Sequence, residues 1–179
     1  MPGLHVRTMT EGDCTSVAEL RVLGWQSAYA GLMPQPFLDA LDVEEGAAWQ
    51  RERFARGPGR TVDLVAERAG RVVGWVSFGP SRDADVPPGE AELYALYAHP
   101  EHYSTGVGRA LVQECVARCA AAGHGRLRLW VVEGNTRARR FYDRAGFGPD
   151  GARAPDEVDG VPVPEIRCEL PLRRPPHPA

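Results

Sequence analysis

The sequence predicts a single α/β domain with a mixed central sheet, antiparallel in its first half and flanked by helices. Three observations predict this fold. The 179 residues are enough for one domain with a sizeable core. Segments with strand-like and helix-like apolar periodicity alternate along the chain. Two strand-like segments are separated by only Ala69 and Gly70, which is typical of a tight antiparallel hairpin. We assign residues 1–172 to the domain and residues 173–179 to a frayed tail.

The composition narrows the class of protein. Hydrophobic residues make up 43% and charged residues 25%, which is usual for a globular chain. The net charge of -3 gives no electrostatic case for a nucleic-acid partner. No apolar run approaches the ~20 residues of a membrane span, and the N-terminus lacks an apolar signal core. We therefore expect a cytoplasmic protein without a membrane partner.

The four cysteines show neither a CxxC pair nor a Cys/His cluster with zinc spacing. We therefore expect no metal site. The sequence leaves the oligomeric state open, and a homodimer is the assembly that we consider.

The first third of the chain predicts one strand followed by helices. Thr10 and Asp13 are N-cap candidates for the first helix, and Pro34 and Pro36 break the helical pattern. The expected elements are a strand over 5–9, a helix ending near residue 30, a short helix over 37–41 and a charged helix over 43–56.

The rest of the chain predicts most of the sheet and two further helices. Asn135 or Thr136 caps the second of these helices, and Gly146 closes it. The expected elements are strands over 61–68, 71–79 and 91–98, a helix from residue 108 to about 122, a strand over 127–132, a helix from 135, and a final hairpin with its return strand over 163–170.

A glycine-bearing loop precedes the helix that begins near residue 108, in the stretch HPEHYSTGVGRAL. A helix N-terminus exposes unpaired N–H groups and the positive end of the helix dipole, and glycine lets an anion approach the backbone closely. Residues Ser104 to Arg109 are therefore a candidate diphosphate cradle, or a purely structural turn. The chain has no lysine, which excludes a Walker loop. Leu111 stands where a dinucleotide fingerprint needs its third glycine.

A second signal lies in the stretch NTRARRFYDRAGF. Asn135 and Tyr142 are seven residues apart, about two helical turns, so they share one face of the predicted helix. A half-buried core tyrosine and a simple helix cap are the alternatives. With the stretch YAHPEHYSTGVGRAL, this pattern resembles the GNAT family of acyl-CoA-dependent N-acyltransferases over residues 62–147. Gly106 and Gly108 match the family pattern Gln/Arg-x-x-Gly-x-Gly/Ala, whereas Tyr103 stands where Gln or Arg is usual.

The resemblance implies a GNAT-like fold with splayed central strands and acetyl-CoA as the acyl donor. It implies that a strand edge holds the pantetheine arm and that the N–H of Ala98 faces the thioester oxygen. It places Tyr142 as the general acid for the leaving thiolate, and a phenol with a pKa of about 10 is protonated at neutral pH. The implied donor-binding residues are Leu96, Tyr97, Ala98, Ser104, Thr105, Gly106, Val107, Gly108, Arg109 and Asn135.

The general base is implied less directly. Glu92 lies six residues before Ala98, and strand alternation predicts that Glu92, Tyr94, Leu96 and Ala98 share one face. In histone-type members of the family, a glutamate at this offset acts as the base, often through water. Glu92 is therefore the predicted base. Glu90 on the same predicted face is its competitor, and a solvated strand end is the structural alternative.

The acceptor pocket is the least defined part. The resemblance implies a pocket between the first helices and the last hairpin, which suggests Trp25, Tyr29 and the segment APDEVDG. The carboxylates of this segment, Asp156, Glu157 and Asp159, either favour a cationic amine as acceptor or belong to a solvated hairpin tip. The leading hypothesis is acetyl transfer from acetyl-CoA to a primary amine of a small molecule, by direct attack in a ternary complex. The alternatives are a protein or peptide N-acetyltransferase and a non-catalytic CoA-binding regulatory domain.

Overall fold

The computed structural model describes residues 3–57 and 59–172, so the predicted tail over 173–179 lies outside the described residues. The strands of the main sheet in this part of the chain are β1 (His5–Thr8), β2 (Val62–Arg68), β3 (Arg71–Pro80), β4 (Ala91–Ala98), β5 (Arg126–Val132), β6 (Gly148–Ala154) and β9 (Glu165–Pro171). They form one sheet in the order β1-β2-β3-β4-β5-β9-β6. The first four strands pair antiparallel, β4 and β5 pair parallel, and β9 pairs antiparallel with β5 and β6. The predicted mixed sheet with an antiparallel first half is confirmed.

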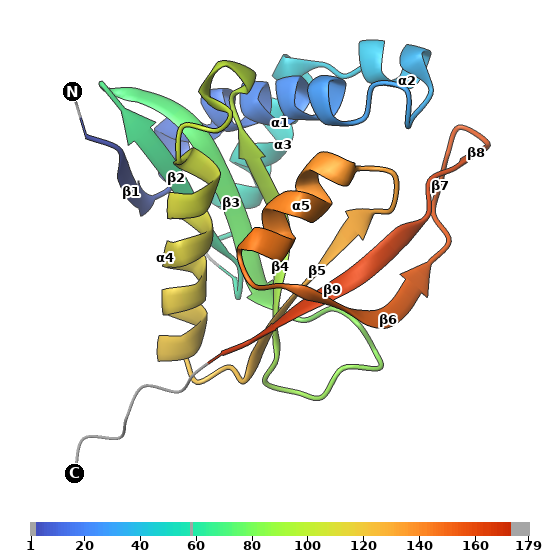
Figure 1. The fold of residues 1–179 in the computed structure, drawn as a ribbon. Helices are drawn as coiled ribbons and strands as arrows, with labels where there is room; N and C mark the ends of the chain where they lie inside the picture. Colours follow the sequence, from blue (N-terminus) through green and yellow to red (C-terminus); the bar gives the residue numbers. More distant parts are fainter. Residues whose placement is uncertain (1–2, 58, 173–179) are drawn as a thin grey trace.

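Helices cover both faces of this sheet. Figure 1 shows α4 and α5 on one side, with α1 and α3 on the other. A short hairpin of β7 (Glu157–Val158) and β8 (Val161–Pro162) projects beyond the sheet. The helices are α1 (Cys14–Ala28), α2 (Gln35–Asp39), α3 (Val43–Ala55), α4 (Val107–Ala121) and α5 (Thr136–Arg144).

The start of α1 is fixed by a buried carboxylate. Thr10 caps a 3₁₀ turn over Glu11–Asp13, and the Asp13 carboxylate accepts the backbone N–H of Thr10 at 2.8 Å. Arg7 donates to the same carboxylate at 2.7 Å, and its hydrogen bond lowers the pKa of Asp13 to about 2. The 3₁₀ turn occupies the position of the first predicted helical turn, so α1 begins at Cys14.

The main core lies between the sheet and the helices α4 and α5. Leu64, Val76, Leu111 and Leu127 are fully buried there. Gly74 on β3 allows α4 to lie close to the sheet, because a Cβ at this position would come within 2.5 Å of Val107 Cγ1. This close packing fixes how near to the sheet the N-terminus of α4 lies. The predicted phosphate-binding loop ends at this N-terminus.

Strands β4 and β5 separate soon after they meet. Only Ala91 with Leu127 and Glu92 with Arg128 are paired between them. Beyond these pairs, the ends of both strands diverge, as the resemblance implied. Because neither strand bonds the other there, the gap leaves backbone groups of β4 available to a ligand.

A bulge in β4 corrects one prediction. Ser77 pairs with Ala95 and Phe78 pairs with Leu93, so Tyr94 is an extra residue on this strand. The bulge reverses the alternation that the sequence predicted. Leu93, Leu96 and Ala98 pack in the core beneath α4 and α5. Since neighbouring strand residues point to opposite faces, Glu92 lies on the other face of the sheet and does not share the face of Leu96 and Ala98.

Candidate active site

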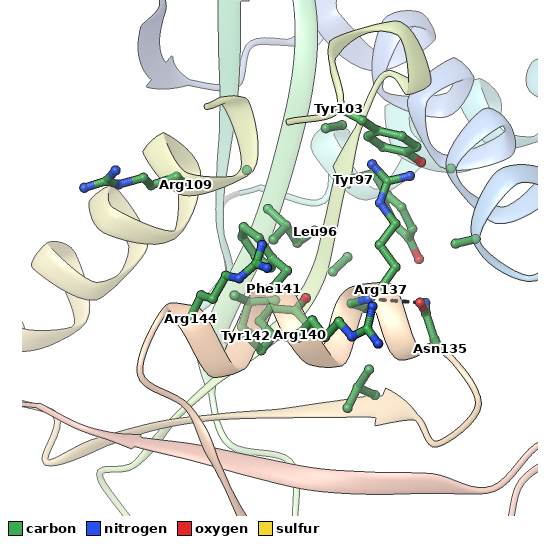
Figure 2. A pocket seen from close by; sticks show the side chains of 18 of the residues that line it. Leu96, Tyr97, Tyr103, Arg109, Asn135, Arg137, Arg140, Phe141, Tyr142 and Arg144 are labelled. Atoms are coloured by element: carbon green, nitrogen blue, oxygen red, sulfur yellow. Dashed lines mark hydrogen bonds between the residues drawn. The ribbon is translucent and has the colours of Figure 1, made fainter. Parts of the chain in front are cut away.

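The main cavity has a volume of about 770 Å³ and lies where β4 and β5 diverge. The N-terminus of α4, the face of α5 and the C-terminal half of α1 complete its walls (Figure 2). Of the residues that the sequence predicted, those lining it are Tyr29, Leu96, Tyr97, Ala98, Ser104, Gly106, Gly108, Arg109, Asn135 and Tyr142.

The loop before α4 presents unused backbone donors to the cavity. Gly106 is the N-cap, with a left-handed φ of 92°, which favours glycine. The first backbone hydrogen bond of α4 runs from Ala110 N–H to Gly106 C=O at 2.9 Å. The N–H groups of residues 107–109 precede this bond and therefore have no partner within the helix. The arrangement provides the positive helix end and the donors that a phosphate group requires.

Two residues of the predicted cradle do not line this cavity. The Thr105 hydroxyl accepts a hydrogen bond from Arg68 at 3.1 Å and donates to the His102 carbonyl at 2.7 Å. The Val107 side chain is 1% exposed and packs in the core. Their side chains hold the loop in place, and only the backbone of residue 107 is suited to contact an anion.

The edge of β4 directs backbone donors into the gap. His99 N–H donates to Val73 C=O of β3 at 3.0 Å. Since hydrogen-bonding direction alternates along a strand, the N–H of Ala98 points away from β3, towards the diverging end of β5. This is the direction in which a donor to a thioester carbonyl is needed.

Tyr142 extends from α5 into the same cavity (Figure 2). The residue is 9% exposed, and the Phe147 ring contacts it edge-on at a centroid distance of 5.7 Å. Burial raises the pKa of Tyr142 above the ordinary value of a phenol. The hydroxyl therefore stays protonated throughout the neutral range, as a proton donor to a leaving group must.

Asn135 caps α5 and also lines the main cavity. Its Oδ1 atom accepts the N–H of Ala138 at 3.1 Å, so it caps α5. The residue is 8% exposed and lines the cavity, where its amide NH₂ group is suited to donate a hydrogen bond.

An aromatic wall closes the cavity on the side of α1. Trp25 Nε1 donates to the Tyr97 hydroxyl at 2.6 Å, and the Trp25 and Tyr29 rings meet edge-on at 5.2 Å. Burial raises the pKa of both Tyr29 and Tyr97. Trp25 is absent from the described lining of the main cavity and supports the wall from behind. In the segment over 154–160, the side chains of Asp156, Glu157 and Asp159 are exposed.

Glu92, the predicted base, lies outside this cavity. It is 2% exposed and lines a second cavity of about 380 Å³ on the opposite face of the sheet. The Arg82 guanidinium donates to Glu92 Oε1 at 2.5 Å, and the Arg82 backbone N–H donates to Oε2 at 2.9 Å. Its competitor Glu90 pairs with Arg128 at 3.0 Å. Both carboxylates thus have arginine partners.

A row of arginines on α5 was not among the residues predicted from the sequence. Arg137, Arg140 and Arg144 line the main cavity (Figure 2). The Arg137 guanidinium stacks on the Tyr103 ring, with 3.5 Å from Cζ to the ring centroid. The spacing of three and four residues places these side chains on one helical face and was visible in the sequence. With Arg109, they make the cavity suited to a ligand with several phosphates.

The described ranges contain no group of three or more His, Cys, Asp or Glu residues arranged to hold a metal ion. In the same part of the chain, no helix is both long enough and apolar enough to cross a membrane.

Comparisons with known proteins agree with this geometry. The acetyltransferase (GNAT) family model matches residues 25–147. An uncharacterized N-acetyltransferase of Mycobacterium tuberculosis is 38% identical over 140 residues, which are 74% of this chain and 84% of that protein.

Two solved structures share the fold. The PaiA N-acetyltransferase of Thermoplasma acidophilum, in complex with coenzyme A, has a TM-score of 0.74 and 20% identity, over 94% of this chain and 99% of its own. The acetyltransferase YncA of Salmonella typhimurium, with acetyl-CoA, has a TM-score of 0.71 and 23% identity, over 99% and 98% of the two chains. The chain therefore belongs to the acetyltransferase (GNAT) family and is an acetyl-CoA-dependent acetyltransferase.

Proposed function

We propose that the protein transfers the acetyl group of acetyl-CoA to a primary amine of a small molecule, by direct attack in a ternary complex. One observation carries the proposal. A single cavity joins the N-terminus of α4, the β4 edge at Ala98 and the Tyr142 side chain. These groups supply phosphate binding, a donor for the carbonyl oxygen and a proton donor, which are what acyl transfer from a thioester requires.

The donor-binding role is distributed along this cavity. The N–H groups of residues 107–109 would hold the diphosphate, with Ser104, Gly106 and Arg109 beside them. The arginines of α5 would contact the remaining phosphate oxygens. The backbone of residues 96–98 and the amide of Asn135 would hold the amide-bearing arm. The donor would then lie with its thioester near the point where β4 and β5 diverge.

The chemical step follows from these positions. The N–H of Ala98 would stabilise the negative charge that develops on the carbonyl oxygen when the amine attacks. The carbon–nitrogen bond forms, the carbon–sulfur bond breaks, and Tyr142 gives its proton to the sulfur. The high pKa of Tyr142 keeps this proton available at neutral pH.

The acceptor side favours a small molecule. Tyr29 and Tyr97, which Trp25 contacts, close one side of the main cavity. The second cavity, on the other face, has a volume of about 380 Å³, which is within the range of small-molecule sites. This volume is consistent with a small-molecule acceptor.

A panel of acceptors tests the proposal. Purified protein is incubated with acetyl-CoA and either small primary amines, including amino acids and polyamines, or peptides with free N-termini and basic side chains. CoA release and the acetylated product are both measured. We expect turnover with small amines. Turnover with peptides alone would identify a peptide N-acetyltransferase, and CoA binding without turnover would identify a regulatory domain.

A further inference from the structure

The second cavity shares a wall with the main one. Trp130 on β5 lines both cavities, so a molecule in the second cavity lies against the residue that borders the donor site. The second cavity lies on the face of the sheet opposite to α4 and α5, because its residues Glu92 and Trp130 alternate with core residues that contact these helices. An acceptor in this cavity would approach the gap between β4 and β5 from the face opposite to these helices.

Three carboxylates line this second cavity, and two of them have arginine partners. Glu92 accepts hydrogen bonds from Arg82. Asp83 accepts the Trp130 indole N–H at 3.1 Å and the Arg167 guanidinium at 3.0 Å. Glu165 on β9 has no ion pair with any residue of the described ranges. Glu165 is therefore the carboxylate of this cavity with an open capacity to accept a proton.

Glu165 also lies at the end of the gap where β4 and β5 have separated. It pairs with Val132, the last residue of β5, at the end where β5 has diverged from β4. The charge of Glu165 contributes to the raised pKa of both Tyr29 and Tyr97, which line the main cavity. The carboxylate is thus within electrostatic reach of the donor site, although its side chain lines the acceptor side.

The surroundings of Glu165 make it a better base than an exposed carboxylate. Burial raises its pKa, and the charges of Asp156 and Glu92 add to this increase, while Arg82 opposes it. Arg82 and Glu92 line the same cavity as Glu165, the charge of Asp156 before β7 also acts on it, and its own charge acts on the phenols of Tyr29 and Tyr97. Two carboxylates and one guanidinium are the charged groups among these neighbours, so with Glu165 the local charge attracts a bound ammonium group.

We propose that the acceptor enters through the cavity of Arg82, Trp130 and Glu165, and that Glu165 takes the proton from its primary ammonium group. This inference rests on the proposed function. It assigns the general base to Glu165 on β9 instead of the predicted Glu92 on β4. Glu92 instead holds Arg82 at the side of the acceptor cavity and has a structural role.

The ammonium group gives one proton to Glu165, and the neutral nitrogen attacks the thioester carbon. The nitrogen loses a second proton as the amide forms, and Tyr142 gives one proton to the leaving sulfur. The second nitrogen proton, passed through water, restores Tyr142, and Glu165 releases its proton to solvent. One proton is released for each amide that forms.

The test compares Glu165→Gln with Glu44→Gln, an exposed glutamate of α3 that lines neither cavity, and with the wild type. The rate constant kcat/KM is measured from pH 6 to pH 10 with the best amine of the acceptor panel, together with the melting temperature and the affinity for CoA. We expect Glu165→Gln to lower kcat/KM about 100-fold at pH 7 and to approach the wild-type rate at high pH, where the amine is already neutral. Glu44→Gln should match the wild type throughout.

The outcomes separate this inference from the proposed function. No turnover of the wild type with any amine would overturn the function itself. Wild-type turnover with an unchanged pH profile in Glu165→Gln would overturn only the role of Glu165. A uniform loss of rate at every pH would also overturn it, because such a loss reports altered structure rather than a missing base. The melting temperature and CoA affinity identify that case.

Discussion

Arg82 donates three hydrogen bonds to Glu92, one from its backbone N–H to Oε2 at 2.9 Å and two from its guanidinium to Oε1 at 3.2 and 2.5 Å. The carboxylate is buried at 2% exposure, so these bonds replace its hydration. They also occupy the oxygens that a general base would need. The pair joins the end of β3 to the start of β4, next to the point where β4 and β5 part.

Glu92→Gln should therefore affect stability more than catalysis. The neutral amide loses the charge-assisted hydrogen bonds, at a cost of about 1–3 kcal/mol in the free energy of unfolding. Urea unfolding measures this loss, and kcat/KM at pH 7 should stay within about threefold of wild type. A large loss of kcat/KM that recovers at high pH, with stability unchanged, would instead return the base to Glu92.

Gly106→Val should abolish donor binding. A Cβ at Gly106 meets no atom within 4 Å, so the substitution fits sterically, but its φ of 92° is unfavourable for valine. The branched side chain would also hinder a phosphate from reaching the backbone N–H groups. Acetyl-CoA raises the melting temperature of a protein that binds it in the native state, and this shift should be lost in the variant.

Gly123→Val is the matched control for this experiment. Gly123 follows the opposite end of α4, with a φ of 85° and open space around its Cβ. Both substitutions carry a similar strain of about 1–2 kcal/mol. The control should lose stability while keeping the full shift with acetyl-CoA. A full shift in Gly106→Val as well would refute the phosphate cradle.

Tyr142→Phe should lower kcat about 100-fold and leave the affinity for acetyl-CoA unchanged. The ring contacts with Phe141 and Phe147 remain, so the fold should tolerate the loss of the hydroxyl. Because burial raises the pKa of Tyr142, the wild-type rate should show no decline from loss of this proton below about pH 10. Pre-steady-state kinetics and CoA titration measure both properties. An unaltered kcat would mean that water protonates the thiolate.

Asp13→Asn should remove an acid-sensitive contribution to stability. Hydrogen bonds from Arg7 lower the pKa of Asp13 to about 2, below its value in an unfolded chain. A depressed pKa stabilises the fold above about pH 4, and this contribution of about 2 kcal/mol is lost as the pH falls from about 4 to 2. Unfolding at pH 7 should show Asp13→Asn to be less stable, with the difference shrinking towards pH 2. A constant difference at all pH values would contradict this assignment.

The parts of the site that local sequence determines could be predicted. The glycine loop and the capped helix α5 each depend on residues close together in the chain, so their spacing places Gly106 at a helix N-terminus and Asn135 and Tyr142 on one helical face, while their proposed roles come from the family resemblance. The three arginines of α5 follow the same local rule and could have been found in this way.

The parts that depend on strand pairing could not be predicted. The bulge at Tyr94 arises from the register between β3 and β4. Because of it, Glu92 lies on the face of the sheet opposite to Leu96 and Ala98. Glu165 approaches the site only because β9 inserts between β5 and β6, a long-range pairing that leaves no local signal. Thr105 was predicted to contact the ligand, but Arg68, on the adjacent hairpin, holds its hydroxyl.

Two-substrate kinetics with acetyl-CoA labelled in its acetyl carbonyl distinguishes direct transfer to the amine from transfer through an acetylated protein. Initial rates are measured over a grid of acetyl-CoA and amine concentrations, and mass spectrometry follows the label in the amide and in the protein. Direct transfer predicts intersecting double-reciprocal lines, with labelled amide and free CoA formed in equal amounts and no label on the protein. Parallel lines with a labelled protein, or CoA release without labelled amide, would contradict direct transfer in a ternary complex.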